Sequence, residues 1–169
     1  MYETVSKAFE DHFGHAHTVA SYAPGRVEVL GNHTDYNEGF VLSAAINFGT
    51  YFLASPSEDS TCRIVAGDLM AEVSFDVNAP NAVTENTWAN YVIGVFAGLQ
   101  SHGEMKTGFN GMFLGNIPLG AGLSSSAALE ICTGLALGKL YGIEVDALEM
   151  AKIGQKAEHE HAGVKCGLL

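Results

Sequence analysis

A run of small residues and hydroxyls near the middle of the chain, GAGLSSSAALE at positions 120–130, constrains the fold more than any other feature. Gly120 and Gly122 allow backbone N–H groups to turn towards a ligand without a Cβ in the way. A helix that begins directly after such a loop presents unpaired N–H groups and the positive end of its dipole. The three hydroxyls of residues 124–126 can donate to phosphate oxygens or ligate Mg²⁺. The segment therefore predicts a strand, a loop and a helix that together bind an anion such as phosphate.

Two other interpretations of this loop stay open at the level of sequence. It is not a Walker A loop, because no Gly-Lys-Ser/Thr sequence follows the glycines. It is close to a Rossmann dinucleotide-binding fingerprint, with Ser125 in place of the third glycine and Glu144 near the ribose-binding spacing. Against that alternative, a dinucleotide site needs no triple hydroxyl, and Asp146 begins a helix where a longer second strand is needed. The purely structural alternative is a serine-capped helix after a glycine turn.

The remaining hydrophobic patterns place strands early in the chain and helices late. Helices are predicted at 3–13, at 87–101, from the glycine–serine loop through Tyr141, and from Asp146 to near Gly163. Strands are predicted within 17–29 (broken by Pro24-Gly25), 40–53, 62–66, 72–77 and 108–114. Because this order is not a regular βαβ alternation and shows no repeats or linker, we expect one α+β domain over residues 1–169.

The composition of the chain excludes some classes of binding partner and favours one cellular compartment. The chain has 169 residues, of which 47% are hydrophobic, so it can close a core and is not disordered. Its formal net charge of -11 disfavours a nucleic-acid or anionic-membrane binder, because phosphate backbones demand a basic face. No apolar run reaches the ~18 residues of a membrane span. The acidic, amphipathic start is no signal peptide, and three widely spaced cysteines form no disulfide or zinc pattern, so we expect a cytoplasmic protein.

A second polar segment, APGRVEVLGNHTDYNEG, begins at Ala23. Arg26, one of two arginines in the chain, stands at the start of a strand, and Asn32, His33 and Asp35 follow on a turn. A cation beside several short polar side chains suits a neutral polyol, since Asp35 can accept two hydrogen bonds from adjacent hydroxyls. The alternative is an Asn/Asp-rich turn that satisfies its own backbone.

Three segments in order resemble one family of enzymes. APGRVEVLGNHTDYNEGFVL resembles the galactokinase signature, and PLGAGLSSSAALE resembles the phosphate loop of the GHMP small-molecule kinases. KAEHEHAGVKCGLL looks like the galactokinase segment that leads into the catalytic aspartate. The resemblance implies a GHMP amino-terminal domain, a mixed β-sheet packed with helices, without the family's second domain. It also implies ATP-dependent phosphorylation of galactose or a related aldose at the anomeric hydroxyl, with ATP and Mg²⁺ as cofactors and the sugar as the other partner.

The resemblance also implies a role for each matched residue. Arg26 would stabilise or orient the reacting groups. Asn32, His33 and Asp35 would hold the sugar, and Gly167 would approach it. The nucleotide would be bound by Trp88, which would pack on adenine, and by Gly120, Ala121, Gly122, Leu123, Ser124, Ser125 and Ser126. Ser126 and Glu158 would ligate Mg²⁺. Without the family, Trp88 is a core residue on a helix; with it, we expect Trp88 to serve in both ways.

This sequence departs from the family's pattern at two places. The family's usual Glu is Asn32 here, which keeps an acceptor but loses a charge, so the affinity for the sugar or its identity is expected to differ. The family's aspartate would follow directly after Leu169, the last residue. We therefore expect an amino-terminal piece of a longer kinase that is inactive alone and whose exposed apolar surface promotes self-association. A non-catalytic sugar and nucleotide sensor on the same fold is the alternative.

Overall fold

The computed structural model describes residues 1–31, 39–118 and 120–167. Its helices are α1 (Tyr2–Phe13), α2 (Ala89–Leu99), α3 (Ser125–Tyr141) and α4 (Ala147–Ala157), and α4 runs directly into a π-helical turn, η2 (Glu158–Ala162). Its strands are β1 (Val19–Leu30), β2 (Leu42–Pro56), β3 (Thr61–Ala66), β4 (Ala71–Asp76) and β5 (Phe109–Gly115). The elements predicted from the hydrophobic pattern are therefore all found, with shifts of a few residues at their ends.

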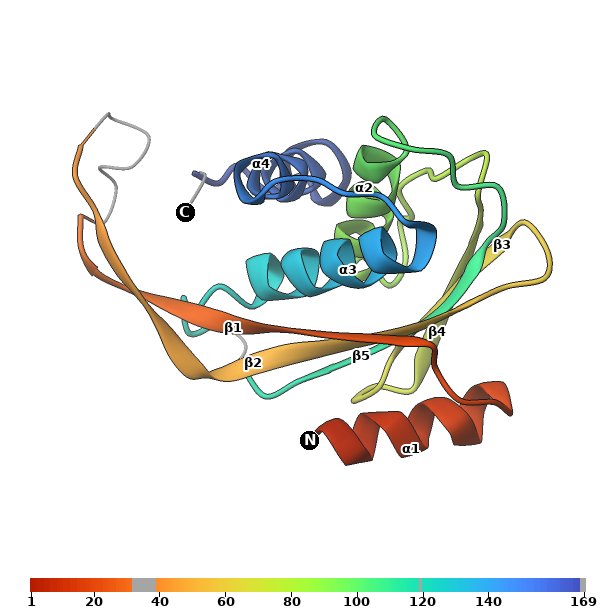
Figure 1. Cartoon of the computed structure of the whole chain (residues 1–169). Coiled ribbons are helices and arrows are strands. Elements are labelled where there is room, and N and C mark those ends of the chain that lie inside the picture. The colour runs from red at the N-terminus through yellow and green to blue at the C-terminus, as the bar shows by residue number, and fades with distance from the viewer. Residues whose placement is uncertain (32–38, 119, 168–169) are drawn as a thin grey trace.

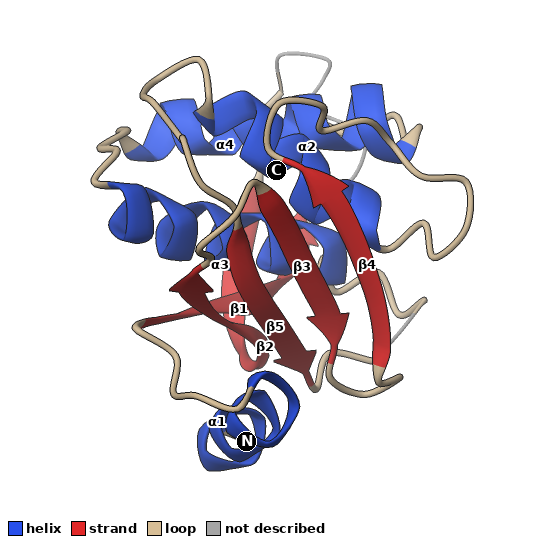
Figure 2. Ribbon diagram, turned by 90° about the vertical axis from the view of Figure 1, so that its right-hand side faces the viewer, coloured by secondary structure: helices blue, strands red, loops and turns tan. Residues whose placement is uncertain are grey.

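The described strands form one sheet of mixed direction. Their spatial order is β1-β2-β5-β3-β4. Neighbouring strands run antiparallel except β3 and β5, which are parallel. After β4 the chain forms α2 and re-enters the sheet on the other side of β3, at the end where β4 stops, so β5 runs parallel to β3 (Figures 1 and 2). The predicted α+β class with a mixed sheet packed by helices is confirmed.

Helices cover both faces of the sheet, but unequally. In Figure 1, α2, α3 and α4 gather on one face and α1 lies alone against the other. Side chains alternate across a strand, so Phe52 of β2 enters the core beneath α3 while Leu53 packs under α1 with Val5 and Phe9. The larger core, which holds Phe96 and Phe109, therefore lies between the sheet and the three-helix layer and carries the elements around the glycine–serine loop.

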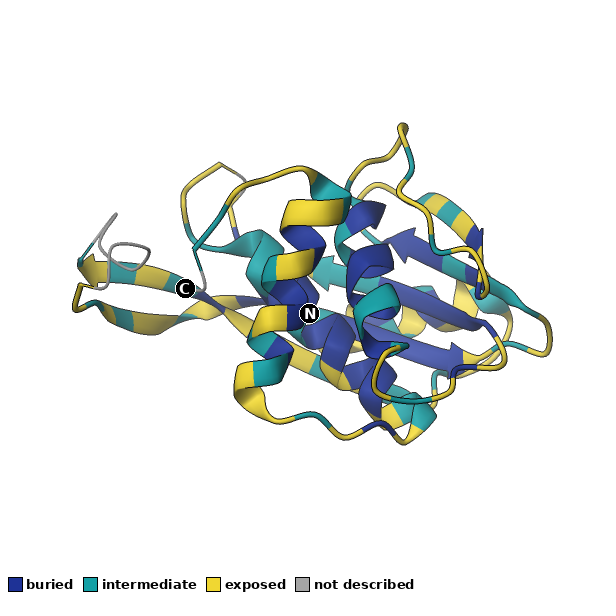
Figure 3. Ribbon diagram, turned by 90° about the horizontal axis from the view of Figure 1, so that it is seen from above, coloured by how far each residue is buried: buried dark blue, intermediate teal, exposed yellow. Residues whose placement is uncertain are grey.

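Strands β1 and β2 continue as a long two-stranded arm beyond the rest of the sheet (Figure 1). Most of its surface is exposed, including Val29, Leu30 and Leu42 (Figure 3). The break expected at Pro24-Gly25 is instead a shift in register between Pro24 and Arg26 within one strand. Because β1 is an edge strand, it tolerates a proline that cannot donate to the ladder, and the shift re-aims the residues that follow.

Local capping signals set the helix ends as the sequence predicts. Gly142 ends α3 in the left-handed region at φ 68°, which glycine adopts without strain. The side chain of Asp146 caps α4 by accepting from the N–H of Glu149 at 2.9 Å. Within the described ranges, none of the helices is both long enough and apolar enough to cross a membrane.

Candidate functional site

The glycine–serine loop joins β5 to α3 in a conformation that only glycine adopts easily at two of its positions. Gly120 and Gly122 have φ of +71° and +68°, and a Cβ at either would meet nothing within 4 Å. The glycines are therefore required by backbone conformation rather than by lack of space. Ser124 shares the left-handed region at φ 58°, which is uncommon for a residue with a Cβ. Three left-handed residues so close together fold the loop tightly around the start of α3.

The beginning of α3 has no side-chain cap. Ser124 is the N-cap residue, yet its side chain makes no capping hydrogen bond. The serine-capped helix considered as a structural alternative is thus not what forms here. The first residues of α3, Ser125 and Ser126, line a hollow together with residues 120–124, Pro118 and Arg26. Backbone donors at a helix N-terminus together with a guanidinium make a site suited to phosphate.

Arg26 reaches this loop because β1 and the loop are docked backbone to backbone. The N–H of Arg26 donates to the carbonyl oxygen of Leu123 at 3.1 Å. Gly25 permits this approach, since a Cβ there would lie only 2.7 Å from the same oxygen. The Arg26 guanidinium is three-quarters buried and lies 3.6 Å from the carboxylate of Glu28, which holds the guanidinium near the loop. Arg26 lines both the loop hollow and the larger cavity beside it.

That larger cavity, of about 380 Å³, lies between β1, α3 and α4. Five of the residues singled out in the sequence line it: Arg26, Ser124, Ser126, Glu158 and Gly167. They come from β1, the start of α3, the π-helical turn and the C-terminal segment, which are far apart in the chain. The fold therefore brings together residues that the sequence could connect only through the family resemblance.

Trp88 lines a third hollow, on the other side of Ser126. This hollow has a volume of about 310 Å³, and Tyr91, Phe113 and Ser125 also line it. The Trp88 ring packs edge-on against Phe113 at 5.4 Å, so it belongs to the margin of the main core. Its indole Nε1 is buried and has no hydrogen-bond partner among the described residues. Ser126 is common to all three hollows, so it marks the point at which they meet.

A buried carboxyl that sequence reasoning missed, Glu130, also lines the 380 Å³ cavity. Burial raises its pKa to about 9, and the nearby charge of Glu158 adds to the shift. The available signal was spacing: Glu130 follows Ser126 by four residues, so the two share one face of α3. Within the described part of the chain, no group of three or more His, Cys, Asp and Glu side chains could hold a metal ion. A cation here would need hydroxyl, water or phosphate oxygens as well, which is how Mg²⁺ is usually bound.

The C-terminal segment that carries Gly167 is held against the π-helical turn by hydrogen bonds to Cys166. Nε2 of His159 lies 3.0 Å from the carbonyl oxygen and 3.2 Å from the amide nitrogen of Cys166, so either tautomer makes one bond. Gln155 donates to the same carbonyl at 3.3 Å. Burial and the neighbouring Glu158 raise the pKa of the Cys166 thiol to about 12, so it is not a thiolate near neutral pH.

Replacing His159 with alanine is expected to loosen this segment. Loss of one hydrogen bond of about 1 kcal/mol should raise the exchange rate of the Cys166 amide by about fivefold to tenfold. Hydrogen–deuterium exchange of peptides covering 163–167 measures the effect. His15→Ala is the control, because His15 is exposed near the end of α1 and should leave that exchange unchanged. Equal hydrogen–deuterium exchange of 163–167 in both variants would show that His159 does not hold this segment in place.

The predicted sugar-binding residues Asn32, His33 and Asp35 lie outside the described residues. Every other site residue implied by the family resemblance is described, and each lines at least one of the three hollows. Their roles in binding stay predictions.

Comparison with known proteins decides the family. The galactokinase galactose-binding signature matches residues 7–56, and the GHMP kinases N terminal domain matches residues 90–169. The structure superimposes on Lactococcus lactis galactokinase with a TM-score of 0.89 and 34% sequence identity over 99% of this chain. The chain belongs to the GHMP kinases. It spans 44% of the length of that galactokinase, which corresponds to the amino-terminal part of a GHMP kinase.

Two kinases of lower sequence identity share the fold. The Methanococcus jannaschii mevalonate kinase matches with a TM-score of 0.77 and 24% identity, covering 90% of this chain and 49% of that one. A D-glycero-D-manno-heptose 1-phosphate kinase from Bacteriodes thetaiotaomicron matches with a TM-score of 0.75 and 21% identity, covering 88% and 50%. The Rossmann alternative is wrong, because α4 follows α3 where a parallel strand is required and the sheet is mixed.

Proposed function

We propose that this chain is the sugar- and ATP-binding part of a galactokinase-like kinase. The whole enzyme would transfer the γ-phosphoryl group of ATP to the anomeric hydroxyl of galactose or a related aldose, giving the sugar 1-phosphate. The observation that carries the proposal is the shared cavity of Arg26, Ser126, Glu158 and Gly167, directly beside the glycine–serine loop. The galactose-binding signature, which includes Arg26, supports the choice of sugar.

Phosphoryl transfer asks a protein mainly for positioning and for neutralisation of the charge on the phosphates. The N–H groups of the loop and of the first turn of α3 would bind phosphate oxygens, and the serine hydroxyls would donate further hydrogen bonds. The Arg26 guanidinium would neutralise charge from the opposite side of the loop hollow, which matters in a protein of net charge -11. Transfer would be direct and in line, with no covalent enzyme intermediate.

The residues present fit a magnesium ion. The Ser126 hydroxyl and the Glu158 carboxylate are hard oxygen ligands, and both line the same cavity. When bound, Mg²⁺ would neutralise charge between the β- and γ-phosphates. The hollow beside Trp88, which also includes Ser126, would receive adenine, and the Trp88 ring would pack on the base.

The sugar would be held by Asn32, His33 and Asp35, with Gly167 close to it. Asn32 stands where the family usually has Glu, so one charge-assisted hydrogen bond to a hydroxyl is replaced by a neutral one. We also place the protein in the cytoplasm, where a reducing environment keeps thiols free; Cys62, Cys132 and Cys166 are all free.

The second candidate is a non-catalytic sugar and nucleotide sensor on the same fold, which Asn32 favours. A panel of aldoses with MgATP, assayed for ADP release on the full-length gene product, separates the two. The kinase predicts turnover with galactose or a close relative, and no detectable turnover by residues 1–169 alone. Binding of sugar and MgATP without turnover by the full-length protein would favour the sensor.

Arg26→Ala is expected to weaken MgATP binding by about tenfold, because it removes a cation from the phosphate hollow. Isothermal titration calorimetry of the full-length gene product measures the change. Arg63→Ala is the matched control: Arg63 is the only other arginine, it pairs with Asp59 at 3.1 Å on β3, and it lines none of the three hollows. Equal MgATP affinity of the two variants would contradict the role of Arg26.

A further inference from the structure

Glu130 is a buried acid, and none of the described contacts compensates the cost of burying its carboxyl group. The residue is 3% exposed, and its Oε1 has no hydrogen-bond partner among the residues that the structure describes. Its Oε2 is pressed against α4 at a glycine, since a Cβ on Gly154 would lie 3.2 Å from that oxygen. The carboxyl group therefore sits between α3 and α4 and borders the 380 Å³ cavity.

A buried carboxyl oxygen without a partner costs free energy unless something compensates it. Glu158, which is 5% exposed, places a second carboxylate at the same cavity. Two buried acids at one cavity repel each other when both are ionised. Retaining both is difficult to explain from packing alone, because a leucine or methionine would fill the same space without this cost.

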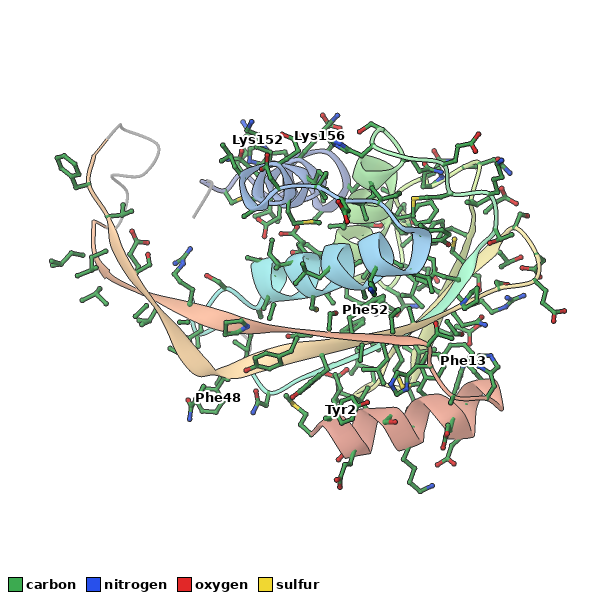
Figure 4. The ribbon with its side chains drawn as sticks, viewed as in Figure 1. Tyr2, Phe13, Phe48, Phe52, Lys152 and Lys156 are labelled. Atoms are coloured by element: carbon green, nitrogen blue, oxygen red, sulfur yellow. The ribbon has the colours of Figure 1, made fainter. Side chains whose placement is uncertain are left out.

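No basic side chain in the described structure neutralises these two acids. Arg26 is the only Lys or Arg that lines the cavity, and its guanidinium faces Glu28. The lysines of α4, Lys152 and Lys156, point away from α3 into solvent, as Figure 4 shows, and they pair with Glu149 and Glu160. The cavity thus combines two acids and a serine hydroxyl with one cation, Arg26, which is already paired with Glu28.

The residues at this cavity supply oxygen atoms of the kind that a small divalent cation prefers. Ser126 and Glu130 are one helical turn apart on the same face of α3, and Glu158 approaches from the π-helical turn. All three offer oxygen, the ligand type that Mg²⁺ and Mn²⁺ prefer. Mg²⁺ is typically bound by one or two carboxylates together with phosphate oxygens, and the phosphate hollow adjoins this cavity at Ser126.

We propose that Glu130 supplies the second carboxylate of a divalent-cation site whose other protein ligands are Ser126 and Glu158. The proposal rests on the proposed function, because phosphate oxygens of the bound nucleotide complete the coordination. The bare backbone of Gly154 makes room for the Glu130 carboxylate, so the site is built where α4 crosses α3.

Mn²⁺ binding tests the proposal without reference to activity. Free Mn²⁺ is counted by electron paramagnetic resonance during titration of the full-length gene product with a non-hydrolysable ATP analogue. Glu130→Gln keeps the shape of the side chain and removes its charge, and it is expected to weaken Mn²⁺ binding at least tenfold, as is Glu158→Gln. Glu160→Gln is the matched control on the same π-helical turn, since Glu160 is exposed, pairs with Lys156 at 3.8 Å and does not line the cavity. Its Mn²⁺ affinity should not change.

The outcomes separate this proposal from the proposed function. Unchanged Mn²⁺ affinity in Glu130→Gln, with weakened affinity in Glu158→Gln, would overturn the role of Glu130 and leave the kinase intact. Failure of the unaltered protein to bind either the analogue or Mn²⁺ would overturn the proposed function itself. If Glu130→Gln does not fold, Glu130→Asp retains the charge on a shorter side chain. The proposal then predicts weaker Mn²⁺ binding with unchanged affinity for the metal-free analogue, and equal Mn²⁺ affinity would reject it.

Discussion

Replacing Gly25 with alanine is expected to lower the free energy of unfolding by about 2–4 kcal/mol and to displace the glycine–serine loop. The new Cβ would lie 2.7 Å from the Leu123 carbonyl oxygen and 3.2 Å from the Cδ1 atoms of Ile46 and Ile117. The isoleucine side chains can rotate away, but a backbone oxygen cannot. The strand and the loop must therefore separate, and the hydrogen bond from the Arg26 N–H to Leu123 is lost.

Two measurements check this expectation. Urea unfolding gives the stability change, and hydrogen–deuterium exchange of the Arg26 amide reports on the lost hydrogen bond. Under the proposed function, the affinity for MgATP should fall at least as far as in Arg26→Ala, because both the loop and the guanidinium move. All three effects come from one contact, which makes Gly25 the most sensitive position for function on β1.

Gly14→Ala is the control for a general loss of stability. Gly14 ends α1 with φ +76°, and a Cβ there would meet nothing within 4 Å. The substitution should therefore cost about 1–2 kcal/mol in backbone strain alone, and it is remote from the loop. If Gly25→Ala and Gly14→Ala gave the same Arg26 exchange rate, the close approach of β1 to Leu123 would not be what positions the loop.

The sequence predicts those parts of the fold whose signals are local. Asp146 and Glu149 predict the start of α4, and in the structure the N–H of Glu149 donates the capping hydrogen bond to the Asp146 side chain. Gly142 ends α3 because a left-handed residue is needed there. Such signals depend on a few neighbouring residues, so they can be recognised without knowledge of the tertiary structure.

Properties that depend on distant residues could not be predicted in this way. Pro24-Gly25 indicated a broken strand, because nothing in the sequence says that β1 is an edge strand where a proline is tolerated. The position of β5 between β2 and β3 is decided by pairing across the whole chain. Glu130 has the sequence context of an ordinary helical acid, and it becomes buried only because α4 crosses it at Gly154.

Some features of the candidate site are likewise predictable from local sequence, and others depend on distant residues. The residues of the glycine–serine loop are enough to predict an anion site there, since backbone conformation and helix dipole are local properties. Placing Arg26 beside Leu123, and Glu158 and Gly167 around the same cavity, required the family resemblance. The contribution of Phe109 to stability likewise depends on distant residues, because strands and helices from different parts of the chain pack against its side chain.

Phe109→Ala is expected to lower the free energy of unfolding by about 3–5 kcal/mol, the usual cost of removing a large aromatic ring from a core. Phe109 begins β5 and is fully buried. Its ring contacts three other rings, with centroid separations of 6.4 Å to Phe52, 6.2 Å to Phe75 and 5.7 Å to Phe96. These come from β2, β4 and α2, so the cavity left behind would border elements that cannot all collapse into it.

Phe48→Ala removes the same group from the same sheet and is the matched control. Phe48 is 40% exposed and points away from the helical layer in Figure 4, so its loss should cost less than about 1.5 kcal/mol. Phe109→Leu should fall between the two, because leucine refills part of the cavity. Urea denaturation of the three variants gives the order. A cost for Phe109→Ala no greater than that for Phe48→Ala would mean that the four rings do not pack as one cluster, and that the sheet and α2 are held together elsewhere.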